Sequence, residues 1–245
     1  MRRFVQALSG FEAMPGLPET VVTELRALPD RYNVSARQRA GVLFAAEGEW
    51  QLASMAWGLV PSWEKEPATK YSTQTARLDR APASRLFRRA WESRRCVVPV
   101  NGYYKWDRTR KPHWPQFIQP LDGLPLYAAG LWERWRAGDD DDAPFLDSFA
   151  LLTFPNPAIP PPLTQDGPLF LPPDRLVDWL TAGGWWARRI AARAAERQPR
   201  LEAYPVARRV GNPALDDYTL LEPADPDARD ALGPEDDGYD VEDDD

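Results

Sequence analysis

The stretch RRCVVPVNGYYKW, residues 94–106, decides the fold more than any other part of the sequence. Its first half, RRCVVPV, is a short apolar run rich in β-branched residues, which is typical of a buried strand. The pair Asn101-Gly102 is a tight-turn signal, and the chain leaves it through the aromatic run YYKW. We therefore predict a strand, a tight bend and a second extended segment that carries Lys105 between aromatic side chains.

Periodic segments on both sides of this stretch indicate a mixed architecture. Apolar residues with helical spacing predict helices at residues 19–28, 85–93, 175–182 and 185–197. Ser84 is the predicted N-cap of the helix at residues 85–93. Alternating or continuous apolar runs predict strands at residues 41–46, 51–58, 115–120, 124–135 and 147–154. The predicted fold class is α+β, a strongly bent, mostly antiparallel and barrel-like sheet with peripheral helices.

Charge is distributed unevenly along the 245 residues, whose net charge is −7. Residues 225–245 contain eleven acidic side chains and one arginine, which leaves a net charge of +3 on the rest of the chain. We predict one domain over residues 1–222 and a disordered acidic tail over residues 223–245. The tail is interpreted as a solubilising appendage, as a nucleic-acid mimic that competes for a basic groove, or as a contact for a protein partner.

Composition excludes several classes of protein. No run approaches the roughly 18–20 apolar residues that a membrane span needs, and the N-terminus is a poor signal peptide, so we expect a cytoplasmic protein. Cys96 is the only cysteine and His113 the only histidine. A disulfide or a zinc site therefore lacks ligands, and we predict neither a metal nor a cofactor.

Eight short motifs follow one another along the chain. They are RYNV (31–34), WGLVPSW (57–63), TARLD (75–79), SRLF with a following tryptophan (84–91), RRCVVPVNGYYKW (94–106), AGLW (129–132), residues 163–171, and YPV with VGN (204–212). In this order they resemble the SRAP family, the SOS-response-associated peptidase-like proteins that cross-link to abasic sites in single-stranded DNA. The resemblance covers residues 1–222 and implies the family's fold, whereas function depends on the site itself.

The resemblance implies a mechanism that this chain does not support. Family members use an N-terminal cysteine to close a thiazolidine on the abasic aldehyde, assisted by an asparagine, a glutamate and a histidine. The corresponding positions here hold Arg2, Thr75, Lys105 and Thr164. None of these supplies a thiol, or a carboxylate that exchanges a proton near neutral pH. We therefore expect this cross-linking activity to be absent, and we expect Cys96 to be a buried core residue.

Part of the DNA-binding surface implied by the resemblance is retained. Its candidates are Arg2, Arg3, Asn33, Trp63, Arg77 and Arg85. Guanidinium groups bind phosphates, and an exposed indole stacks on a base. Against this, the arginines of residues 85–95 are equally compatible with a solvated helix face. Trp57, Trp91, Trp106 and Trp132 are expected in the core.

Three functions stay open at this point. The first is a catalytically degenerate SRAP protein that binds single-stranded or abasic-site DNA without a covalent bond and is nucleoid-associated. The second is a regulatory pseudoenzyme that binds a protein partner and no DNA. The third is an altered enzyme in which Lys105 forms a Schiff base with the abasic aldehyde. The alternative for Lys105 is a structural pairing with Asp79 or another acid.

Overall fold

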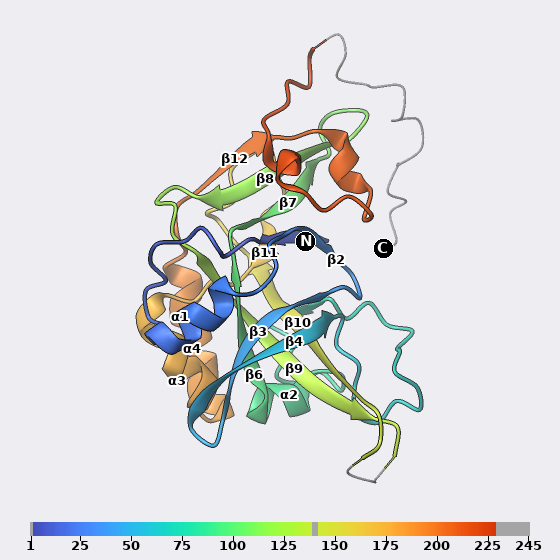
Figure 1. The fold of residues 1–245 in the computed structure, drawn as a ribbon, viewed down its shortest axis with the longest axis vertical. Helices are drawn as coiled ribbons and strands as arrows, with labels where there is room; N and C mark the ends of the chain where they lie inside the picture. Colours follow the sequence, from blue (N-terminus) through green and yellow to red (C-terminus); the bar gives the residue numbers. More distant parts are fainter. Residues whose placement is uncertain (1, 139–141, 229–245) are drawn as a thin grey trace.

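The computed structural model describes residues 2–138 and 142–228 and contains two sheets with helices at the periphery (Figure 1). The predicted α+β class with a bent, mostly antiparallel sheet is confirmed. None of the helices in the described part of the chain is long and apolar enough to cross a membrane.

The larger sheet is closed on itself. Its long strands are β3 (Arg39–Ala46), β4 (Glu49–Trp57), β6 (Arg95–Val100), β9 (Leu126–Arg136) and β10 (Phe145–Pro155). They follow the order β10-β4-β3-β6-β9, and β9 also pairs with β10, so that the five strands form a barrel-like ring. The short strands β5 (Thr75–Arg77) and β11 (Asp166–Pro168) both pair with β10.

The smaller sheet is antiparallel and lies above the ring in Figure 1. Its order is β12-β8-β7-β1-β2, with β1 (Arg3–Gln6), β2 (Arg31–Ser35), β7 (Gly102–Asp107), β8 (Trp114–Pro120) and β12 (Leu201–Pro205).

The bend at Asn101-Gly102 carries the chain from β6 in one sheet to β7 in the other. The side chain of Asn101 accepts a hydrogen bond from the amide of Ala7 (2.7 Å) and donates one to its carbonyl (2.9 Å). A Cβ atom at Gly102 would lie 2.2 Å from the carbonyl oxygen of Ile118. Only glycine allows two backbones to approach so closely. The predicted bend is therefore present, and it is the place where the chain passes from one sheet to the other.

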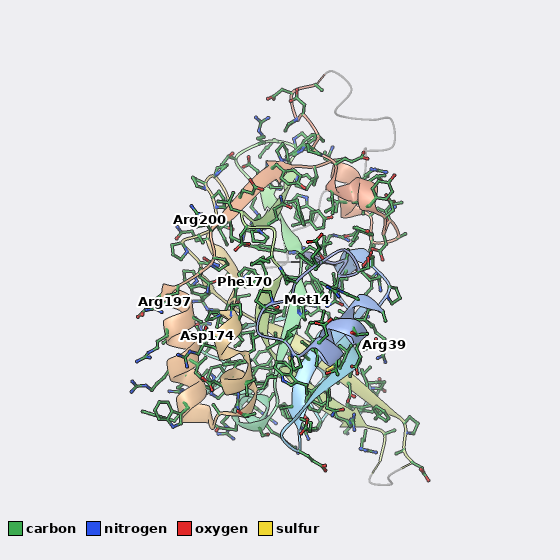
Figure 2. All side chains as sticks on the ribbon, turned by 60° about the vertical axis from the view of Figure 1, so that its left-hand side comes forward. Met14, Arg39, Phe170, Asp174, Arg197 and Arg200 are labelled. Atoms are coloured by element: carbon green, nitrogen blue, oxygen red, sulfur yellow. The ribbon has the colours of Figure 1, made fainter. Side chains whose placement is uncertain are left out.

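The helices are α1 (Glu19–Arg26), α2 (Arg88–Ser93), α3 (Leu176–Thr181) and α4 (Gly184–Glu196). Three 3₁₀ turns cover Pro173–Arg175, Arg208–Gly211 and Tyr218–Leu221. Helices α3 and α4 form one side of the molecule, and Figure 2 shows Arg197 on the outer face of this layer.

The helix predicted over residues 85–93 is shorter than expected. It begins at Arg88, and the residue at its N-cap is Phe87, without a side-chain cap. The predicted cap, Ser84, lies in the preceding turns, where its hydroxyl accepts a hydrogen bond from the amide of Leu86 (3.3 Å). Serine and threonine side chains stabilise such local turns as readily as helix starts, so the sequence signal was ambiguous.

The first residues of the predicted acidic tail contact the domain. Pro223 forms an isolated bridge with Val206, and Asp227 pairs with Arg110 of the β7–β8 loop (2.8 Å). The remainder of the predicted tail, residues 229–245, lies outside the described residues, as do residues 139–141 of the acidic β9–β10 connection.

Candidate nucleic-acid interface

Lys105 lies inside the molecule, on β7. It is 8% exposed, and its Nζ donates a hydrogen bond to the backbone carbonyl of Asp166 on β11 (2.5 Å). Burial lowers the pKa of Lys105, an effect that the carboxylate of Asp166 opposes and Arg108 reinforces. Of the acids in the structural alternative, Asp79 or another acid, the one beside Lys105 is Asp166, whereas Asp79 forms its ion pair with Arg77 (3.1 Å).

Strand pairing locates the other three degenerate family positions, Arg2, Thr75 and Thr164. On β10, Thr153 lies opposite Arg77 of β5 and opposite Pro168 of β11. Thr75, the first residue of β5, lies opposite Leu151 of β10, and Thr164 lies two residues before β11. On β1, Arg3 lies opposite Tyr104 of β7, which places the exposed Arg2 next to Lys105 along the sheet. These positions hold threonine hydroxyls and cations where the family chemistry needs a thiol and a carboxylate.

Cys96 is a core residue, as predicted. It is fully buried on β6, and a Cβ atom at Gly130 of the neighbouring strand would come within 2.8 Å of its sulfur. Burial raises the pKa of the Cys96 thiol well above its ordinary value. A thiol in this environment stays protonated and inaccessible, so it is not a nucleophile.

Arg3 and Asn33, two of the candidates for DNA binding, make internal contacts. Arg3 donates to the side-chain oxygen of Asn33 (3.2 Å) and to the carbonyl of Gly211 (2.5 Å). Asn33 is fully buried, and its Nδ2 lies within hydrogen-bond distance of the carbonyls of Val210 (3.2 Å) and Leu215 (2.8 Å). These contacts tie β2 to the C-terminal turns and leave Asn33 no donor that faces solvent.

The exposed candidates Trp63 and Arg85 line one groove of about 820 Å³, which we call the Trp63 groove. Its walls are the loop that follows β4 and the turns that precede α2, and they include Lys70 and Tyr71. Trp63 is 43% exposed and Tyr71 49% exposed, and the ammonium group of Lys70 lies 5.5 Å from the Tyr71 ring. Glu64 and Glu66 also line the groove and reduce its positive charge.

Two hydrogen bonds hold the loop that carries Trp63. The indole of Trp135 on β9 donates to the carbonyl of Glu64 (2.8 Å), and Arg89 of α2 donates to the hydroxyl of Ser62 (3.0 Å). Two exposed aromatic faces and two cations around one groove are suited to an unstacked base and its phosphates.

Sequence reasoning missed Tyr71 and Lys70. They belong to no motif and to no periodic segment, and only the tertiary structure brings residues 70–71 next to residue 85. The four large aromatic residues expected in the core divide into two groups. Trp57 and Trp91 are buried, whereas Trp106 and Trp132 are partly exposed.

A family model and the sequences of related proteins indicate the same family for this chain. The family model described as "SOS response associated peptidase (SRAP)" matches residues 3–213. The abasic site processing protein YedK of Escherichia coli (strain K12) is 25% identical over 227 residues, which cover 90% of this chain and 98% of that protein. The abasic site processing protein YoaM of Bacillus subtilis is 27% identical over 197 residues, covering 78% of this chain and 84% of that protein.

Solved structures agree with the sequence relatives on the fold. A crystal structure of a protein from Bacteroides thetaiotaomicron has a TM-score of 0.68 at 22% identity and covers 83% of this chain and 90% of its own. Another, from Bordetella bronchiseptica, has a TM-score of 0.63 at 25% identity, with coverage of 84% and 99%. The closed ring, the second sheet and the peripheral helices are therefore a known architecture.

Proposed function

Because this chain belongs to the SRAP family, we propose that it binds single-stranded DNA, including strands that carry an abasic site, without forming a covalent cross-link. Relatives named as abasic site processing proteins supply the DNA-damage context. The observation that carries the proposal is the Trp63 groove, where an exposed indole, an exposed phenol and two cations face the same open space.

The residues at the degenerate family positions support the non-covalent part of this proposal. The family mechanism needs a thiol, and the one cysteine of this sequence is buried on β6. Where the family has the carboxylate of a glutamate, this chain has the ammonium group of Lys105. The hydroxyls of Thr75 and Thr164 do not exchange protons near pH 7. Binding by stacking and by phosphate contacts requires none of these groups.

Replacing Trp63 with alanine tests the groove. A base stacked on an aromatic side chain contributes about 1–3 kcal/mol, so Trp63→Ala should weaken binding of a labelled single strand by about 5- to 150-fold. Fluorescence anisotropy at two salt concentrations measures this loss, and wild-type affinity should fall as salt rises because bound phosphates release counterions.

A matched control for this experiment is Tyr218→Ala, which removes an aromatic side chain that is 66% exposed and lies on the last 3₁₀ turn. Its affinity should equal that of the wild type. If the wild-type protein binds no single strand even at low salt, the proposal fails and the protein-interaction role becomes the better hypothesis.

Lys105 favours a second candidate function, imine formation on an abasic aldehyde. Its pKa is lowered by burial, which increases the fraction of neutral amine near neutral pH. The nitrogen would attack C1′ of the open sugar, and the carbinolamine would lose water to give a Schiff base. Borohydride would then reduce that imine to a stable secondary amine.

Borohydride trapping decides between the two candidates. If Lys105 is the nucleophile, wild-type protein should give a trapped species with abasic single-stranded DNA, and Lys105→Ala should lose it. The control is Lys111→Ala, which removes an exposed lysine from the β7–β8 loop, outside the groove, and should leave trapping intact. The absence of an adduct with wild type contradicts this second function and leaves non-covalent binding. An adduct that persists in Lys105→Ala shows that another amine reacts, and it contradicts both candidates.

A further inference from the structure

We propose that the single strand held in the Trp63 groove continues across α2 to the exposed tryptophan pair, Trp185 and Trp186, at the start of α4. This inference rests on the proposed function and specifies its ligand as a single strand longer than the groove itself. The path has three parts: the groove, the outer face of α2 and the tryptophan pair.

The tryptophan pair is an exposed aromatic platform. Trp185 is 60% exposed and Trp186 58% exposed, and their rings lie 4.7 Å apart in an edge-to-face arrangement. The guanidinium of Arg189 lies 5.1 Å from the Trp185 ring and 5.5 Å from the Trp186 ring. A cation beside two exposed indoles offers a base a stacking surface and offers its phosphate a counter-charge.

Helix α2 connects this platform to the groove directly. At one side, Arg89 bonds to Ser62, the residue before Trp63 (3.0 Å). At the other side, the indole of Trp91 donates to the carbonyl of Gly184, the residue before the tryptophan pair (3.3 Å). Figure 1 shows α2 between helices α3 and α4 on one side and the loop that follows β4 on the other.

The outer face of α2 carries the charge that such a path needs. Arg88 and Arg89 are exposed there, Arg85 is exposed in the turns just before α2, and Arg188 extends the positive charge onto α4. Arg85, Arg88 and Arg188 form no ion pair with any residue that the structure describes. The exposed carboxylate on α2 is that of Glu92, which lies beside Gly184. Cations therefore dominate between the two aromatic sites.

This arrangement favours a nucleic-acid strand over an acidic peptide. Flat aromatic surfaces occur at both ends, and arginines bridge the six residues of α2, a length of about 9 Å. Unpaired bases stack on such surfaces without regard to sequence, while the backbone presents regularly spaced charges to the arginines. Duplex DNA fits less well, because its bases are already stacked on one another.

The test compares two oligothymidylates of about 5 and about 16 nucleotides, the range over which single-strand sites extend. Wild-type protein should bind the longer strand at least about 10-fold more tightly, as expected for one additional stacked base. The double variant Trp185→Ala/Trp186→Ala should lose this gain and keep its affinity for the short strand. Arg88→Glu, in the middle of the path, should also reduce the gain, and Tyr218→Ala should not.

The results of this test distinguish a failure of this inference from a failure of the proposed function. If the double variant keeps the full gain with length, the path across α2 is wrong while binding in the groove stands. If wild type binds neither strand, both proposals are overturned. Because both tryptophans and Arg88 are exposed, the variants should unfold at the wild-type urea midpoint, which confirms that a lost gain is not lost folding.

Discussion

Replacing Arg95 with alanine is expected to lower the free energy of unfolding by about 3–5 kcal/mol. Arg95 is 4% exposed at the start of β6, and its guanidinium donates to the carbonyls of Trp91 (2.5 Å), Trp179 (2.7 Å) and Ala182. These carbonyls belong to the ends of α2 and α3, where helices have no internal donors left. Alanine would leave two buried acceptors and one partly buried acceptor without a partner, and a cavity beside the Trp179 ring.

Urea unfolding measures this effect, and the chain offers two matched variants. Arg88→Ala removes an exposed arginine from α2, the helix just before β6, and should change the free energy of unfolding by less than about 0.5 kcal/mol. Arg95→Lys should recover only part of the loss, because an ammonium group cannot reach three carbonyls with the planar fork of a guanidinium. An Arg95→Ala protein as stable as wild type would show that these bonds contribute nothing.

Arg95 also shows where prediction from sequence stops. The arginines of residues 85–95 were compatible with a solvated helix face, and this holds for Arg88 and Arg89 but is wrong for Arg95. The helix ends at Ser93 and β6 begins two residues later, so the last arginine points into the core. Hydrophobic periodicity cannot reveal which distant helix ends need a donor, because that depends on tertiary packing.

Local signals predicted the local elements well. The β3–β4 hairpin follows from two apolar runs on either side of Glu47-Gly48. Glu47 and Gly48 both adopt positive φ angles in the turn. The parallel pairing of β10 with β4, which closes the ring, joins residues that are far apart in sequence, and no local signal indicated it. The site shows the same division. The motif residue Trp63 was predicted, whereas Tyr71 on the same groove was not.

Replacing Arg94 with alanine is the second substitution expected to destabilise the fold by about 3–5 kcal/mol. Arg94 follows α2 and forms an ion pair with Glu133 of β9, whose side chain is 2% exposed. The guanidinium also lies 5.5 Å from the Trp132 ring, and the carbonyl of Arg94 accepts a hydrogen bond from the Trp132 amide (2.8 Å). Alanine at this position would leave the buried carboxylate of Glu133 without its cation.

A double-mutant cycle with Glu133→Gln separates the lost pair from the lost packing. Glutamine is close to glutamate in shape but carries no charge, so Arg94→Ala/Glu133→Gln should be more stable than Arg94→Ala alone. Urea midpoints of the four proteins give the coupling energy between the two sites, which should exceed about 1 kcal/mol because the residues are in contact. Strictly additive effects would mean that Arg94 does not stabilise the carboxylate of Glu133. The loss of stability in Arg94→Ala would then come from the contact of Arg94 with Trp132.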